Sequence, residues 1–187
     1  MQGTKGVGRQ IEEQISLFDK PVILLSVNPV SYQECVLGAL KYFSERFGMG
    51  LYITLNKPTA VLRSHLQNSG VPLGSLVFLD SVTNTQEQET DACWFLGRMR
   101  ELADLSIAVS KVVSKRDQIK YVLFDSVSTL LIYNDPKSVA RFCHLIAEKL
   151  RGWGISGAFI SMQLSEGTDM DAQISQFCDA FVKGDLA

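Results

Sequence analysis

Short apolar runs alternate with amphipathic segments along the whole chain. Most of these runs are continuous rather than interrupted by polar residues, which is typical of strands that are buried on both faces of a sheet. Five runs have strand length and a sixth begins near the C-terminus, at residues 21–27, 50–55, 75–79, 120–125, 155–161 and 181–182. The pattern therefore predicts a sheet that is covered on both sides.

Helical periodicity fills the intervals between the runs. Gly48 and Gly152 mark two helix ends, and Pro136 marks a helix start. The predicted helices cover residues 12–18, 31–47, 59–66, 89–115 (with a break near 103–106), 136–152 and 169–177. Alternating strands and helices require right-handed crossovers. We therefore predict an α/β fold with a mainly parallel β-sheet flanked by helices on both faces.

The length of 187 residues indicates a single domain over residues 1–187. Residues 1–9 contain three glycines but follow no strand, so we expect a flexible terminus there rather than a phosphate-binding loop. The helix at residues 12–18 is expected to pack at the sheet edge, with docking of a partner as the alternative. We read residues 83–90 as a surface loop.

The composition of the chain argues against binding to nucleic acid or to a membrane. The net charge is −2 and the sequence pI is about 5.7, which gives no electrostatic footprint for nucleic acid. No apolar run reaches the length of a membrane span, and the first residues lack the apolar core of a signal peptide. We therefore expect a soluble cytoplasmic protein that binds neither membrane nor nucleic acid. Buried free thiols are the expected state of the four cysteines, Cys35, Cys93, Cys143 and Cys178.

In an open parallel sheet, ligands bind at the carboxyl ends of the strands. Here the predicted strand ends carry a polar rim formed by Asn28, Asn56, Lys57, Asp80, Ser81, Asp125, Ser126 and Gln163. Elsewhere, His65 and His144 lie in predicted helices without ligand-spaced partners, so we expect no metal site. For Trp153, turn packing is preferred over anchoring a partner. Residues 166–171 resemble a calcium loop only superficially, and we expect an exposed loop there.

The segment from residue 22 to residue 34 has the element order of a P-loop. An apolar run enters an Asn28-Pro29 turn and then a helix. A P-loop needs glycines whose backbone N–H groups wrap phosphate, then a lysine and a Ser/Thr for phosphates and Mg²⁺. This turn has neither glycine nor lysine.

Two strings carry a resemblance to a known family: Gly50-Leu51-Tyr52-Ile53-Thr54-Leu55, and the run from Tyr121 to Leu130, which ends its strand in Asp125-Ser126. Together with the order of elements over about residues 20–183, they resemble the archaeal KaiC-like branch of the RecA-type ATPases. The resemblance implies a RecA-like P-loop NTPase fold, in which Asp125 occupies the Walker B position.

The chain departs from that family where the chemistry lies. Against the family's Walker A motif, Val27, Val30 and Tyr32 replace glycines, Gln33 replaces the lysine, and Glu34 replaces the Ser/Thr. The family's catalytic carboxylate pair is replaced by Asn56 and Lys57. Side chains with a Cβ disfavour the positive-φ geometry of a phosphate cradle, and Glu34 would repel a triphosphate. The resemblance therefore implies a pseudo-ATPase with a degenerate Walker A motif, without catalytic residues, ATP or Mg²⁺, in which Asp125 and Ser126 cap the strand end.

The leading interpretation is a non-catalytic RecA/KaiC-like domain that acts as a protein-interaction or regulatory module. We expect it to form a homo-oligomer or a hetero-oligomer with related RecA-like proteins. The alternative is a nucleotide-binding sensor or slow ATPase with an atypical phosphate loop. A nucleic-acid-binding relative and an unrelated small-molecule enzyme are weaker alternatives, because the chain shows neither a basic stripe nor a nucleophile–base constellation.

Overall fold

A computed structural model describes residues 2–83, 90–97, 101–163 and 170–184, with side chains from residue 6 onward. Within these ranges, seven strands form one sheet: β1 (Val22–Val27), β2 (Gly50–Thr54), β3 (Leu76–Asp80), β4 (Cys93–Phe95), β5 (Tyr121–Asp125), β6 (Ser156–Met162) and β7 (Ala180–Gly184). The helices are α1 (Gln2–Ile15), α2 (Tyr32–Phe47), α3 (Thr59–Asn68), α4 (Leu102–Ser114), α5 (Pro136–Trp153) and α6 (Met170–Ser175), with 3₁₀ turns η1 (Leu73–Ser75) and η2 (Val127–Ile132).

All strand pairs are parallel, in the order β4-β3-β2-β5-β6-β1-β7. The expected α/β class is therefore confirmed. Register places Thr54 of β2 between Asp80 of β3 and Asp125 of β5, and it places Ser26 of β1 beside Ser161 of β6. The polar strand ends are thus neighbours along one edge of the sheet.

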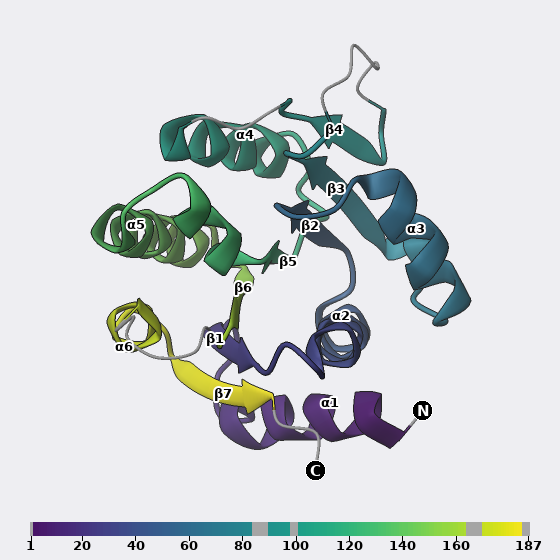
Figure 1. The fold of residues 1–187 in the computed structure, drawn as a ribbon. Coiled ribbons are helices and arrows are strands. Elements are labelled where there is room, and N and C mark those ends of the chain that lie inside the picture. The colour runs from purple at the N-terminus through teal and green to yellow at the C-terminus, as the bar shows by residue number, and fades with distance from the viewer. Residues whose placement is uncertain (1, 84–89, 98–100, 164–169, 185–187) are drawn as a thin grey trace.

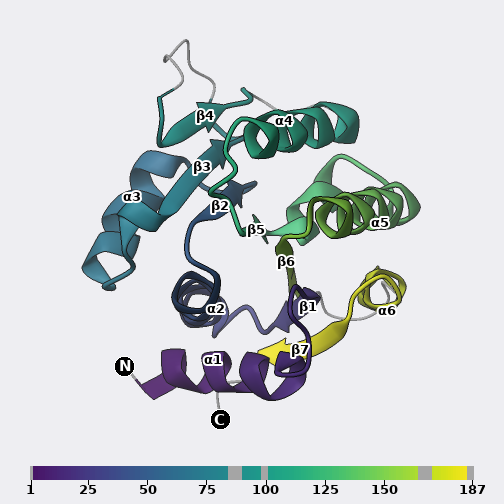
Figure 2. The same cartoon turned by 180° about the vertical axis from the view of Figure 1, so that it is seen from behind.

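Helices cover both faces of the sheet (Figures 1 and 2). On one face, α4, α5 and α6 enclose a core centred on Phe124 and Phe159. On the other, α1, α2 and α3 enclose a core that includes Tyr52, Phe78 and Tyr121. Continuous burial of β1, β2, β3 and β5 follows from this double cover, as their apolar runs predicted.

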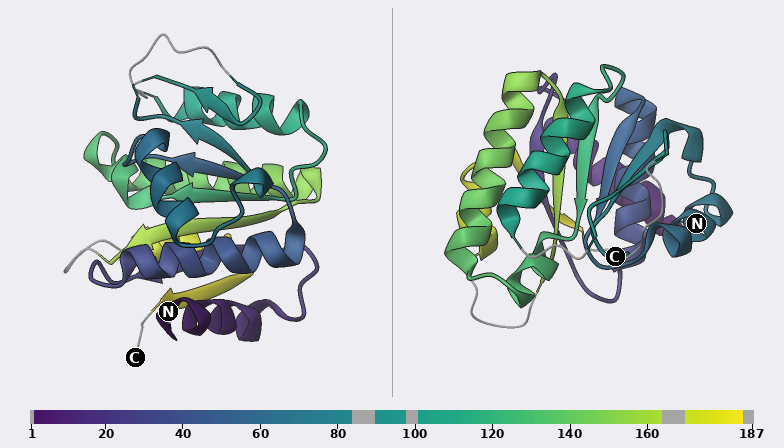
Figure 3. Two further views of the ribbon diagram at one scale, coloured as in Figure 1. Left: turned by 90° about the vertical axis from the view of Figure 1, so that its right-hand side faces the viewer. Right: turned by 90° about the horizontal axis from the view of Figure 1, so that it is seen from above.

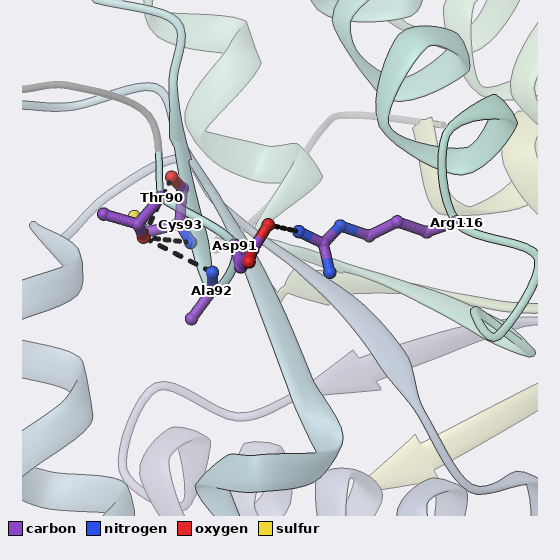
Figure 4. Close-up of polar contacts among 5 residues, drawn as sticks. All are labelled: Thr90, Asp91, Ala92, Cys93 and Arg116. Atoms are coloured by element: carbon purple, nitrogen blue, oxygen red, sulfur yellow. Dashed lines mark hydrogen bonds and ion pairs between the residues drawn. The ribbon is translucent and has the colours of Figure 1, made fainter.

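Each end of the sheet is closed in its own way. Beyond β7, α1 packs against β7 and α2, at the bottom of Figure 1 and of the left view of Figure 3. At the other end, Thr90 N–H donates to the carbonyl of Cys93 (2.8 Å), and Cys93 N–H donates to Thr90 Oγ1 (3.0 Å), as Figure 4 shows. Cys93 therefore uses both backbone groups within its own turn. Unpaired edge groups are what invite strand addition, so these two contacts protect the sheet.

The predicted helix over residues 89–115 is wrong in its first part. Cys93–Phe95 form the short edge strand β4, held to β3 by bonds from Phe78 N–H to Ala92 O (2.9 Å) and from Leu96 N–H to Asp80 O (2.8 Å). The apolar spacing that suggested a helix relied partly on Met99, which lies outside the described residues. α4 begins at Leu102 and continues through the expected break.

The N-terminal helix is longer than predicted. Residues 2–9, expected to be flexible, lie in α1, which ends at Ile15 rather than at Phe18. Val7, Ile11 and Ile15 are completely buried, and this burial offsets the low helix propensity of the glycines. The expectation that this helix packs at the sheet edge is confirmed. Two expected loops lie largely outside the described residues: residues 84–89 of the first and 166–169 of the second.

Candidate functional site at the carboxyl edge of the sheet

The connection between β1 and α2 is a tight turn over residues 28–31. Ser31 N–H donates to Asn28 O (3.1 Å), and Val30 N–H donates to Asn28 Oδ1 (2.9 Å). Asparagine favours such a turn because its side chain can accept a bond from the backbone two residues on. Two N–H groups that a phosphate-wrapping loop would direct at its ligand are therefore bonded inside the turn.

The last strand packs against this turn. Ser31 Oγ and Cys35 Sγ both donate to Gly184 O, at 3.3 and 3.2 Å. A Cβ at Gly184 would lie 2.9 Å from Val27 Cγ1, so the fit requires glycine there. The start of α2 is thus engaged by the protein's own backbone.

Tyr32 bridges the start of α2 and the end of β2. Its hydroxyl accepts a hydrogen bond from Asn56 Nδ2 (2.9 Å). Gln33 and Glu34 are exposed, and Glu34 lies in the first turn of α2, where a carboxylate is favoured by the helix dipole. At the positions of the family's lysine and Ser/Thr, the chain therefore presents an exposed amide and an acid.

Asp125 ends β5 as a buried carboxyl group with little hydrogen-bond support. Its Oδ2 accepts from the hydroxyl of Tyr52, while its Oδ1 is buried and has no partner among the described residues. Burial raises the pKa of Asp125 to about 7. The neighbouring strand end holds a second such atom, Asn56 Oδ1. Leu55 N–H donates to Asp125 O (2.8 Å), which continues the pairing of β2 with β5, and the Ser126 hydroxyl lies 3.2 Å from Thr129 Oγ1 in the following turn.

Asp80 ends β3, and both of its carboxylate oxygens accept hydrogen bonds. It accepts from Thr59 N–H (2.7 Å), Val82 N–H (2.9 Å), Thr83 N–H (2.8 Å) and the Thr83 hydroxyl (2.7 Å). Burial alone would raise the pKa of Asp80, but these bonds together lower it below the usual value. Asp80 therefore fixes the start of α3 and the turn that follows β3.

Other rim residues are also tied to the protein itself. The Ser81 hydroxyl donates to Thr54 O (2.7 Å), and Gln163 N–H donates to Val27 O (2.9 Å). The Lys57 carbonyl accepts from the hydroxyl of Thr54. The polar rim that the sequence predicted is present, and its contacts are those of loop anchoring.

A buried network on the opposite face was not predicted. Asp171 of α6 accepts from Ser26 (2.7 Å) and Ser161 (2.6 Å), the register partners of β1 and β6. Ser161 also lies 3.2 Å from the Ser128 hydroxyl. The available signal was two serines at the ends of otherwise apolar strands. The network attaches α6 to the sheet.

The remaining candidates lie apart from this edge. His65 is exposed, and His144 is exposed and stacks on Phe177 with ring centroids 4.2 Å apart. Trp153 is exposed at the end of α5. Three cysteines are buried free thiols as expected, whereas Cys178 is partly exposed. In the described part of the chain, no three His, Cys, Asp or Glu residues come together as metal ligands would.

Comparison with known proteins places the chain by fold and by family. The crystal structure of the KaiC-like protein PH0186 from the hyperthermophilic archaeon Pyrococcus horikoshii OT3 is similar, with a TM-score of 0.64 and 11% identity over 87% of this chain and 70% of that chain. At this identity the likeness shows the fold, which is RecA/KaiC-like. None of the described helices has both the length and the apolar character needed to cross a bilayer.

The comparison with curated proteins finds no match. A sequence family described as a family of unknown function, DUF7504, matches residues 51–183. The chain is a member of the DUF7504 family.

Proposed function

We propose that this domain is a non-catalytic RecA/KaiC-like module that acts through protein interaction or regulation and has lost ATP hydrolysis. The proposal rests on the hydrogen bonds that the β1–α2 connection makes within the protein. Its N–H groups are bonded to Asn28, and the Tyr32 side chain reaches from the first residue of α2 to Asn56. A triphosphate would have to displace these contacts before it met the N–H groups of Val30 and Ser31.

The charges around the connection support the same proposal. A phosphate site places positive charge and N–H donors at the anion. Here the first turn of α2 carries Glu34, and Asp125 lies buried on the same side of the sheet as α2, beside Tyr52. Glu34 would repel a phosphate at the start of α2, and Asp125 would do so where it is ionised.

The residues of the rim also support the proposed loss of hydrolysis. A water nucleophile needs a general base within hydrogen-bonding reach. Asp80 is engaged by four donors, and Asn56 cannot accept a proton at neutral pH. Asp125 has the elevated pKa of a base, but its tie to Tyr52 holds it within the core.

Partner binding on this scaffold would use helices and loops. We propose a homo-oligomer or a hetero-oligomer with related RecA-like proteins, in the cytoplasm. Because α1 and Thr90 close the two ends of the sheet, such an assembly would not extend the sheet from one subunit into the next. Size-exclusion chromatography with light scattering, with and without nucleotide, measures the assembly directly. A monomer at all concentrations, alone and with related proteins, would argue against this part of the proposal.

Isothermal titration with Mg²⁺-ATP tests the loss of nucleotide. We expect no heat of binding at millimolar ligand. A Kd below about 100 µM would instead establish the alternative, a nucleotide-binding sensor or slow ATPase.

A restored loop gives the constructive test. The variant Val27→Gly/Val30→Gly/Tyr32→Gly/Gln33→Lys/Glu34→Thr reinstates the residues that a phosphate cradle needs. ATP binding should appear in this variant only. The matched control carries the three glycines but keeps Gln33 and Glu34, and it should show no heat of ATP binding. Equal binding by the unaltered chain would contradict the proposal.

A further inference from the structure

An open groove runs between α5 and α6, which lie side by side on the face of the sheet opposite α1 and α2 (Figure 1). It has a volume of about 230 Å³, and its lining includes Lys137, Arg141, His144, Gln173, Gln176 and Phe177. None of these residues belongs to the polar rim at the strand ends. The groove is therefore a feature separate from the candidate site described above.

Buried contacts hold the two walls of the groove. Ala140 of α5 and Ile174 of α6 belong to the same core cluster, and Asp171 ties α6 to two serines of the sheet. The His144 ring stacks on Phe177, with centroids 4.2 Å apart and an angle of 22° between the ring planes. The backbone of both walls is therefore positioned by the core of the protein.

Two cations on α5 line the groove without a counter-ion. They are the ammonium group of Lys137 and the guanidinium group of Arg141, and both residues are exposed. In the described part of the chain, neither side chain forms an ion pair or a hydrogen bond. Both groups are therefore available to an anion from outside.

The carboxylates on the same helices are occupied elsewhere. Asp135 accepts from the N–H and the hydroxyl of Ser138 (3.0 and 2.6 Å), and Asp171 accepts from the two serines of the sheet. Glu148 Oε1 lies 3.6 Å from His144 Nε2 and is not part of the lining. The described lining therefore carries two positive charges and no carboxylate, in a protein whose net charge is −2.

The spacing of the donors suits a peptide segment. Lys137 and Arg141 are one turn apart on α5, so they are separated by about 6 Å along the helix axis. Alternate residues of an extended chain point to the same side at intervals of about 6.6 Å. Two acidic residues separated by one other residue therefore match the two cations. Opposite them, the amides of Gln173 and Gln176 form no hydrogen bond among the described residues and present further N–H donors.

The size of the groove favours a partner protein over a small molecule. Pockets for small molecules usually measure about 300–1,000 Å³ and enclose most of the ligand. This groove is smaller, at about 230 Å³, and its two cations are exposed. Exposed ion pairs contribute little free energy each. A partner protein gains further contacts outside the groove, which a small anion does not.

We infer that the groove between α5 and α6 binds an acidic segment of a partner protein, in which two carboxylates separated by one residue pair with Lys137 and Arg141. The amides of Gln173 and Gln176 donate to the same carboxylates. The inference rests on the proposed role in protein interaction, and it adds the chemistry of the partner and the surface that meets it.

NMR of the backbone amide signals of the full chain tests the inference, with the capped peptide Gly-Glu-Gly-Glu-Gly as the probe. The peptide should shift the signals of Arg141, Gln173 and Gln176 in a saturable manner, at millimolar concentration because exposed ion pairs are weak. The capped peptide Gly-Gln-Gly-Gln-Gly, and potassium chloride at matched ionic strength, should produce no saturable shift. Saturable shifts with either control, or none with the acidic peptide at about 50 mM, would overturn the inference.

Two further probes test the pairing of two carboxylates. The capped peptide Gly-Glu-Gly-Gly-Gly, which carries one carboxylate, should bind about threefold more weakly than the peptide with two. Equal affinity of the two peptides would contradict the proposed pairing. Tighter binding of inorganic phosphate than of the acidic peptide would assign the groove to a small anion and would also overturn the inference.

Charge-removing variants locate the binding. Lys137→Gln and Arg141→Gln should each weaken binding of the acidic peptide about threefold, and the double variant about tenfold because the two pairs act independently. Lys183→Gln is the matched control, because it removes one positive charge from a separate hollow beside Glu13 of α1. It should change the affinity less than about 1.5-fold. Unchanged affinity in the double variant, or an equal loss in the control, would refute the site.

The same spectra separate this inference from the proposed loss of nucleotide binding. Mg²⁺-ATP should leave the amide signals of Val30 and Ser31, in the β1–α2 connection, unchanged. Saturable shifts of these two signals would contradict the proposed function and would leave the peptide result as it stands. Absence of peptide binding would refute the groove alone.

Discussion

Asp80 and Asp125 lie on either side of Thr54 in the sheet, at equivalent strand ends, and both are buried. Asp80 accepts four hydrogen bonds and its pKa is lowered, whereas Asp125 accepts one from Tyr52 and its pKa is raised to about 7. The difference teaches that burial alone does not set the charge of a carboxyl group. The number of donors aimed at its oxygens does.

The largest effect should come from Asp80. Asp80→Ala removes the acceptor for Thr59 N–H, Val82 N–H and both donors of Thr83, and it leaves one buried and two partly buried N–H groups without this partner. We expect a loss of about 4 kcal/mol in the free energy of unfolding, measured by urea denaturation. A loss below about 1 kcal/mol would mean that these bonds are not formed in solution.

Asp125 should behave in the opposite way. At pH 8, Asp125→Asn should increase the free energy of unfolding by about 3 kcal/mol, because the buried group no longer has to ionise. The same urea experiment measures it. A destabilised Asp125→Asn protein at pH 8 would show that the ionised carboxylate has a donor or cation that stabilises it.

The pH profile of the unaltered protein follows from the same shift. Between pH 3.8 and about 7, unfolded Asp125 has released its proton while folded Asp125 retains it, so its contribution to stability falls with rising pH and levels off above pH 7. The slope from this group is about 1.4 kcal/mol per pH unit. Asp80 acts in the reverse direction, because the stability that it contributes is lost as the pH falls through its lowered pKa. In Asp125→Asn, stability should no longer fall as the pH rises toward 7, whereas the loss of stability at low pH that comes from Asp80 should remain.

Tyr52→Phe should have a smaller effect and a specific signature. Loss of the bond to Asp125 should cost about 1.5 kcal/mol and raise the pKa of Asp125 further, so that stability levels off at a higher pH. Tyr121→Phe is the matched control, because it removes a buried hydroxyl that lies 2.8 Å from Ser44 Oγ. It should lower the stability similarly without moving the pH profile. If the two variants gave identical pH profiles, Tyr52 would have no influence on the ionisation of Asp125.

The smallest effect is expected at Tyr32. Tyr32→Phe removes the partly buried bond to Asn56 and should lower the free energy of unfolding by about 0.7 kcal/mol. Tyr133→Phe, in which the tyrosine is 74% exposed, serves as the control and should leave stability unchanged. Equal effects of the two changes would indicate that Tyr32 does not hold α2 to β2.

Most of the fold could be predicted because its strands are continuous apolar runs. The runs at residues 21–27 and 120–125 correspond to β1 and β5 with shifts of one residue. The sequence pattern did not predict β4, because a three-residue strand has no periodicity of its own and is defined by its pairing with β3. The start of α1 was not predicted, because packing of Val7 and Ile11 overrides the low helix propensity of the glycines.

The candidate site could be predicted in its residues but not in its contacts. The positions of Asn28, Tyr32 and Asp125 followed from strand ends and motif order. The bond from Asn56 to Tyr32, and the bond from Ser26 to Asp171 across 145 positions, follow from tertiary structure alone. The opposite ionisation of Asp80 and Asp125 also depends on which loops direct their N–H groups at each carboxylate.

The helical cover over β7 has a practical consequence for handling the protein. A recombinant fragment that starts at Pro21 would lack α1 and would expose the side of the edge strand Ala180–Gly184 against which α1 packs. Bare strands of this kind template cross-β growth between chains. Such a fragment should precipitate or form fibrils in storage while the intact chain stays dispersed, so truncation from the N-terminal side is the wrong way to trim this domain for crystallisation.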